Sequence, residues 1–97
     1  MSRVAFSGLA KQDLREIAAY IRSNNPAAAR RVVSRIRETC RTTLAMFPEA
    51  GTMRDDVLPG LRCFSVENYV IYFHGRNPVV IVRVLHGAQD ATPEMFQ

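Results

Sequence analysis

The chain has 97 residues, 47% of them hydrophobic and 23% charged, with a formal net charge of +4. This balance is typical of one folded domain and excludes a disordered chain. No apolar stretch reaches the roughly 18–20 residues of a membrane-spanning helix, and the N-terminus lacks the pattern of a secretory signal. We therefore expect a single cytoplasmic domain over residues 1–97 with no membrane association.

The N-terminal half predicts a short strand followed by two helices. Val4 and Phe6 alternate with polar or small residues, as in a strand. Apolar residues at spacings of three and four then predict a helix over about residues 9–23. Asn25 is expected to cap a second helix, with Pro26 at its first position. Because the connection is short, the two helices should form an antiparallel hairpin.

The second helix is predicted from Pro26 to about Phe47, and it concentrates the positive charge of the chain. Between residues 30 and 41 its only acid is Glu38, whereas the same stretch holds five arginines: Arg30, Arg31, Arg35, Arg37 and Arg41. A helix of this kind can attract nucleic acid or an acidic protein partner. It can equally be a solvated face whose arginine stems cover the edge of the core.

The C-terminal half predicts strands. Residues 48–60 are rich in proline and glycine and form the one long connection. Three strands follow over residues 61–66, 69–74 and 79–86, joined by turns into an antiparallel meander whose last strand is central. The first strand should pair beside that last strand, while residues 88–97 are expected to be a tail that is loosely held or ordered only by a partner. The predicted fold is therefore α+β, in the order β-α-α-β-β-β.

Cys40 and Cys63 fall inside apolar patterns without neighbouring metal ligands. Both are interpreted as buried small hydrophobes. We therefore expect no metal site, no disulfide and no cofactor.

Four stretches in this order resemble the ParE family of the RelE/ParE toxin superfamily, from type II toxin–antitoxin modules. They are LREIAAYI at 14–21, PGLR at 59–62, YVIYF at 69–73 and IVRVLHGA at 81–88. The resemblance implies a helical hairpin on a small antiparallel sheet, in a cytosolic protein held inactive by an antitoxin. It also implies one of two activities: ParE-like members act on DNA gyrase, and RelE-like members cleave messenger RNA at the ribosome.

The residues that separate these activities are Arg62, Arg83 and His86. Cleavage of RNA through its 2′-hydroxyl needs a base, an acid and cations around the phosphate. Arg62, Arg83 and His86 occupy positions that RelE-like nucleases use, but no lysine follows Lys11 and no tyrosine follows Tyr72. Glu49 is a further candidate base, although nothing in the sequence fixes its position. This incomplete set favours a toxin that is not an enzyme.

Each candidate also has a structural interpretation. Arg62 can be an outward arginine on an edge strand. Arg83, inside an apolar strand, requires an acid such as Glu67 or Asp90, or access to solvent. His86 can simply end its strand.

We therefore predict a gyrase-inhibiting toxin in a hetero-oligomer with a ParD-like antitoxin. The antitoxin should lay an apolar helix on the hairpin, with acidic side chains near the arginines. The alternatives are a ribosome-dependent RNA endonuclease that uses Arg62, Arg83 and His86, and a degenerate toxin that only binds its antitoxin. The predicted partner-binding residues are Arg30, Arg31, Arg35, Arg37, Arg62, Arg83 and His86.

Overall fold

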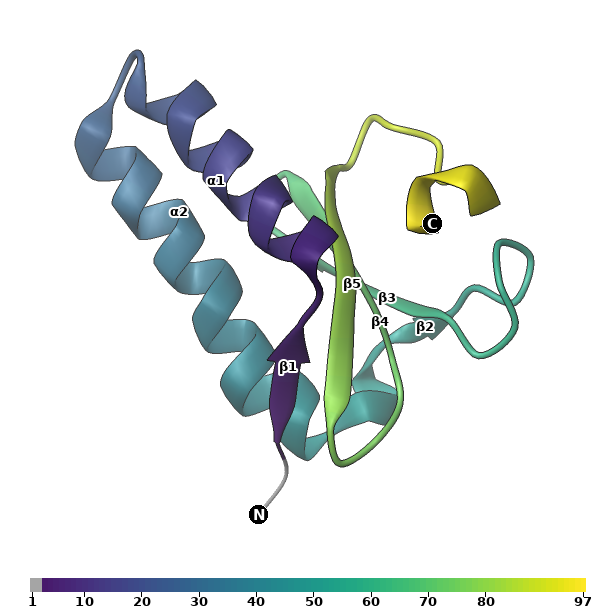
Figure 1. The fold of residues 1–97 in the computed structure, drawn as a ribbon. Helices are drawn as coiled ribbons and strands as arrows, with labels where there is room; N and C mark the ends of the chain where they lie inside the picture. The colour runs from purple at the N-terminus through teal and green to yellow at the C-terminus, as the bar shows by residue number, and fades with distance from the viewer. Residues whose placement is uncertain (1–2) are drawn as a thin grey trace.

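The computed structural model describes residues 3–97 and shows a helical hairpin lying against one face of a five-stranded sheet (Figure 1). The predicted α+β class and element order are confirmed. The main elements are β1 (Val4–Phe6), α1 (Gly8–Arg22), α2 (Pro26–Thr39), β2 (Thr52–Met53), β3 (Arg62–Val66), β4 (Tyr69–His74) and β5 (Val79–His86).

The sheet has the strand order β1-β5-β4-β3-β2, with β3, β4 and β5 forming the predicted antiparallel meander. One detail of the prediction is corrected, because β1 pairs with β5 in parallel and the sheet is therefore mixed. The chain between these two strands passes through both helices, and parallel pairing requires such a long crossover. The two-residue strand β2 was not predicted, because it is too short to show an alternating pattern.

Both helices begin at a side-chain cap, of which Asn25 was predicted and Ser7 was not. The Ser7 side chain accepts a hydrogen bond from the Ala10 N–H, and the Asn25 side chain accepts one from the Ala28 N–H. After α2 the chain continues through one π-helical turn, Cys40–Leu44, whose first and last residues are fully buried. The wider turn lets both side chains face the core. Within residues 3–97 no helix is long and apolar enough to cross a membrane.

The sheet is covered on both faces. The helices bury the first face through a core that includes Leu14, Ile36 and Phe73. Cys40 belongs to this core, and burial raises the pKa of its thiol to about 12, so it packs as the predicted small hydrophobe. Cys63 is half-buried on the opposite face.

The C-terminal tail covers that opposite face instead of lying loose. Pro93–Phe96 forms a short 3₁₀ helix, seen in yellow in Figure 1, on the side of the sheet away from the hairpin. Phe96 meets Tyr72 edge to face, with 5.3 Å between the ring centroids. The sequence missed this packing because the tail has only two large apolar residues, and their partner is a distant strand.

Gly51 provides a test of this packing. A Cβ atom placed on Gly51 would lie 2.5 Å from Cζ and 2.9 Å from Cε1 of the buried Phe73 ring. Gly51→Ala should therefore destabilise the fold by about 1–3 kcal/mol, measured by urea unfolding. Gly8→Ala is the matched control, because nothing lies within 4 Å of its Cβ, and its stability should stay within about 1 kcal/mol of the parent. Equal stability of the two variants would contradict the packing described.

Candidate functional site

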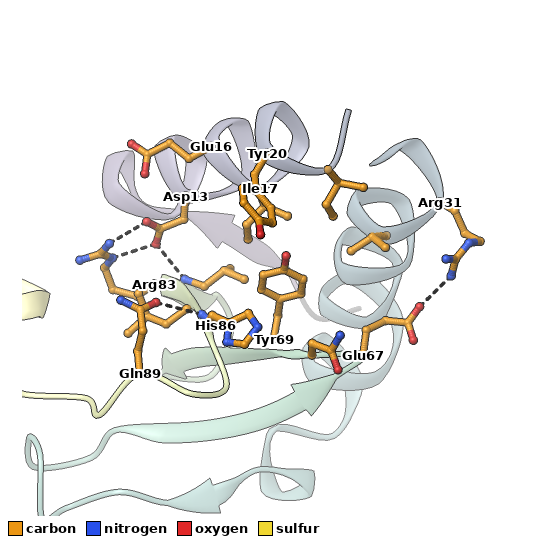
Figure 2. A pocket seen from close by; sticks show the side chains of 15 residues that line it. Asp13, Glu16, Ile17, Tyr20, Arg31, Glu67, Tyr69, Arg83, His86 and Gln89 are labelled. Atoms are coloured by element: carbon orange, nitrogen blue, oxygen red, sulfur yellow. Dashed lines mark hydrogen bonds and ion pairs between the residues drawn. The ribbon is translucent and has the colours of Figure 1, made fainter. Parts of the chain in front are cut away.

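A cleft of about 740 Å³ lies between α1, the start of α2, the β3–β4 turn and the end of β5 (Figure 2). It contains three of the predicted residues, Arg31, Arg83 and His86. Tyr69 forms an edge-to-face contact with His86, and burial together with nearby Tyr20 raises the pKa of its phenol. The cleft thus has an aromatic centre with an ion pair at each end.

Arg31 forms one of these ion pairs. Its Nη1 lies 2.8 Å from Oε1 of Glu67 in the β3–β4 turn. Both side chains reach solvent, so the pair contributes less than about 1 kcal/mol to stability. The pairing nevertheless neutralises Arg31, which separates it electrostatically from the other arginines of α2.

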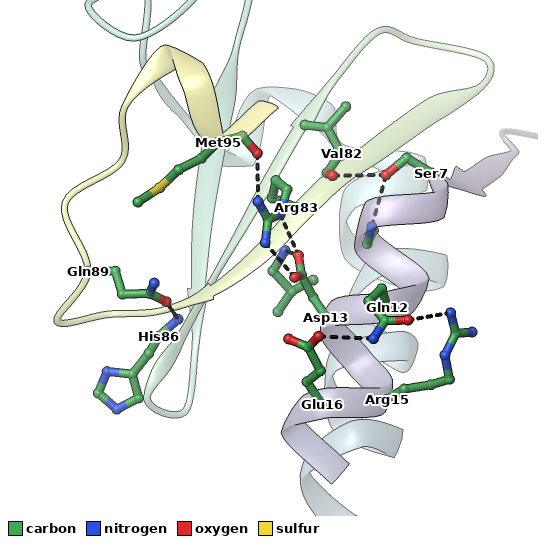
Figure 3. A network of polar contacts seen from close by, with 12 residues as sticks. Ser7, Gln12, Asp13, Arg15, Glu16, Val82, Arg83, His86, Gln89 and Met95 are labelled. Carbon is green, nitrogen blue, oxygen red and sulfur yellow. Dashed lines mark hydrogen bonds and ion pairs between the residues drawn. The ribbon is translucent and has the colours of Figure 1, made fainter. Parts of the chain in front are cut away.

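Arg83 forms the other ion pair, with Asp13 of α1 (Figure 3). Its Nε and Nη2 donate to the two carboxylate oxygens at 2.8 and 2.6 Å, and its Nη1 donates to the Met95 carbonyl oxygen at 2.6 Å. The Asp13 carboxylate raises the pKa of Arg83, so this guanidinium stays charged. The expected partners, Glu67 and Asp90, are not used.

Asp13 was missed by the sequence analysis, although one signal was available. It lies three residues after Ala10 and four before Ile17, on the buried side of α1. It is the one buried charged side chain within residues 3–97, and it also accepts a hydrogen bond from the Val84 N–H. An acid on an apolar helix face requires a buried cation or N–H donors, and β5 supplies both.

The structure brings Arg83 and His86 into one cleft and leaves Arg62 outside it. Arg62 stands opposite Phe73, and His86 stands opposite Tyr69 at the other end of β4. Arg62 and His86 are thus separated by four residues along the strands and by two strand spacings, which corresponds to roughly 16 Å between their backbones. Arg83 stands opposite Tyr72, which belongs to the other face of the sheet.

These residues and Glu49 are instead held by local contacts. Arg62 donates to the Gly51 carbonyl oxygen at 3.2 Å. Nδ1 of His86 accepts a hydrogen bond from the Ala88 N–H at 3.0 Å. Glu49 lies 3.4 Å from Arg76 in an exposed ion pair. Each of these contacts lies within the fold, and none joins the candidate residues to one another.

A second hollow, of about 490 Å³, lies between α1 and α2, and we call it the hairpin groove. Alanines and Val33 contribute its apolar surface, and three arginines line it without any acid: Arg22, Arg30 and Arg37. Arg37 also lies over the Phe6 ring, 5.8 Å from its centroid. Arg35 is exposed and lines neither this groove nor the cleft.

Asp13→Ala should destabilise the chain by about 3 kcal/mol, because it leaves a largely buried Arg83 without its carboxylate. Urea unfolding measures this loss. Glu67→Ala, which breaks the exposed pair with Arg31, is the control and should cost less than about 1 kcal/mol. If the two variants lost the same stability, Asp13 would not have the role assigned to it.

Comparisons with known proteins agree with this fold. The chain is similar to Toxin ParE3 of Caulobacter vibrioides, with 40% identity over 53 residues. The match covers 54% of this chain and 53% of the relative, so the chain spans about half the length of that relative. A chain from the chromosomal ParDE system of P. aeruginosa has a TM-score of 0.75 at 22% identity, over 89% of this chain and 96% of the other.

A chain of the RelBE2 toxin–antitoxin complex from Mycobacterium tuberculosis has a TM-score of 0.67 at 22% identity, over 88% of this chain and 96% of the other. At these identities the two structures show a shared fold. The family model of the ParE toxin of the type II toxin–antitoxin system parDE matches residues 4–91. This match covers most of the sequence, and the chain therefore belongs to the ParE toxin family of type II toxin–antitoxin systems.

Proposed function

We propose that this ParE-family toxin acts by binding DNA gyrase and trapping it on cleaved DNA, without breaking bonds itself. The observation that carries the proposal is the separation of Arg62 from His86, together with the ion pair that holds Arg83. Proton transfer and charge stabilisation at one phosphate require groups within hydrogen-bonding distance of that phosphate. Arg62 and His86 lie roughly 16 Å apart, and the Arg83 guanidinium is held by Asp13, so the three do not meet this requirement.

The alternative is a ribosome-dependent RNA endonuclease that uses Arg62, Arg83 and His86. It would require Arg83 to leave a bidentate ion pair and a carbonyl oxygen. Breaking a buried pair of this kind costs about 3–5 kcal/mol. A toxin that acts by binding alone does not require Arg83 to leave this ion pair.

The antitoxin of this toxin is proposed to be ParD-like and to occupy the hairpin groove. The apolar surface of the groove suits one face of an amphipathic helix. Its arginines have no acid among the groove residues, so acidic side chains of the partner would supply the missing countercharge. The resulting complex is a toxin–antitoxin hetero-oligomer.

The gyrase proposal is tested with the purified chain, gyrase and relaxed plasmid. Supercoiling should be lost and cleaved DNA should accumulate, while transcripts from cells that express the chain remain intact. His86→Ala should behave as the parent does, because the His86 ring packs on Tyr69 and accepts a hydrogen bond from the Ala88 N–H, and no hydrogen bond joins it to Arg62 or Arg83. Codon-phased transcript cuts that disappear in His86→Ala would overturn the proposal. Unaffected supercoiling together with intact transcripts would identify a degenerate toxin instead.

The antitoxin site is tested by one substitution at two positions of α2. Arg30→Glu places an acid at the hairpin groove and should weaken antitoxin binding at least tenfold by calorimetry. Arg35→Glu makes the same change at an exposed position outside the groove, and its effect should stay below about threefold. The partner in this experiment is a ParD-like antitoxin. Equal losses in the two variants would place the antitoxin elsewhere.

A further inference from the structure

Three arginines form a row along one side of the second helix. Arg30 and Arg37 are seven residues apart in α2, which places them within about 20° of each other at 100° per residue, and Arg41 follows about one turn later in the π-helical turn. Arg31 and Arg35 lie about 100–140° around the helix from Arg30. We call the first three residues the arginine row.

The arginine row is not neutralised within the fold. The ion pairs within residues 3–97 use Arg31, Arg54, Arg76 and Arg83, so none involves a member of the row. Arg30 and Arg41 are exposed, and Arg37 is half-buried over Phe6. Arg22 of α1 adds a fourth cation from across the hairpin groove. This side of the hairpin therefore carries uncompensated positive charge.

The spacing of the row suits a regular line of phosphates. Eleven residues of helix span about 16 Å, and each strand of B-DNA carries one phosphate per roughly 3.4 Å of helix axis. The row thus runs alongside about five base-pair steps. A guanidinium can also donate two parallel hydrogen bonds to one phosphate, as a lysine cannot.

The surroundings of the row favour a duplex over a single strand. Proteins that bind single strands combine positive charge with aromatic rings on which bases stack. No aromatic residue lines the hairpin groove, and the nearby Phe6 ring is covered by Arg37. The surface around the arginine row therefore offers contacts to a phosphate backbone and no ring on which a base could stack.

We propose that the arginine row binds the phosphate backbone of duplex DNA without reading its sequence. This inference goes beyond the proposed function, because it requires neither gyrase nor an antitoxin. Arg30 and Arg37 also line the hairpin groove, so a partner seated in the groove excludes DNA from the row. Release of the partner would then expose a DNA-binding surface.

The test is the salt dependence of binding to a fluorescent 20-base-pair DNA of arbitrary sequence. The full-length chain should bind at micromolar concentration in 50 mM salt, with log K falling against log salt at a slope of about −3 to −4. The triple variant R30Q/R37Q/R41Q should lose at least tenfold in affinity, and its slope should fall to about −1. Replacement of the same three residues by lysine should preserve most of the slope.

The matched control is R31Q/R35Q/R76Q, which removes the same charge from positions outside the row and should keep the parent slope. Circular dichroism verifies that every variant is folded. Equal losses in the two glutamine variants would overturn the proposal, since binding would then follow net charge alone. Absence of binding at 50 mM salt, or tighter binding to single-stranded RNA of equal length, would also overturn it. Each of these results leaves the gyrase experiment unaffected.

Discussion

The ion pair between Asp13 and Arg83 is the interaction on which the rest of this structure depends. It joins α1 to β5, and Arg83 extends it to the tail through the Met95 carbonyl oxygen. A buried carboxylate is costly unless its oxygens are hydrogen-bonded, and here the guanidinium and the Val84 N–H satisfy them. The ion pair therefore links the hairpin, the sheet and the tail at one point, beside the apolar contacts that hold each of them.

The same region also closes an open edge of the sheet. β1 pairs only with Val79–Ile81, so the rest of β5 has no neighbouring strand on that side. Ser7 donates to the Val82 carbonyl oxygen, Asp13 accepts from the Val84 N–H, and Gln89 accepts from the His86 N–H. An unpaired strand edge can pair with a strand of another chain through its free N–H and C=O groups. Here the three side chains hydrogen-bond those backbone groups of β5. The arginine row, which forms no ion pair in the described part of the chain, lies on the helical hairpin instead.

Local patterns predicted most of the fold but little of the site. Alternation and short turns identified β4 and β5 with their observed bounds, and Asn25 with Pro26 identified the start of α2. The partner of Arg83 lies 70 residues away in the sequence, so no local pattern indicates it. Which arginines of α2 stay unpaired likewise depends on where the fold brings Glu67. The sequence identified a basic helix, and tertiary structure neutralises one of its arginines, Arg31, while the other four form no ion pair within residues 3–97.

The central claim is that Arg83 serves the fold and not a reaction. The double variant D13N/R83M tests it most directly, because asparagine still accepts from the Val84 N–H while both charges are removed together. Replacement of a buried ion pair by groups of similar volume is often neutral for stability. The account predicts a folded variant that inhibits gyrase supercoiling within a few fold of the parent. A variant that folds as the parent does and has lost this inhibition would contradict it.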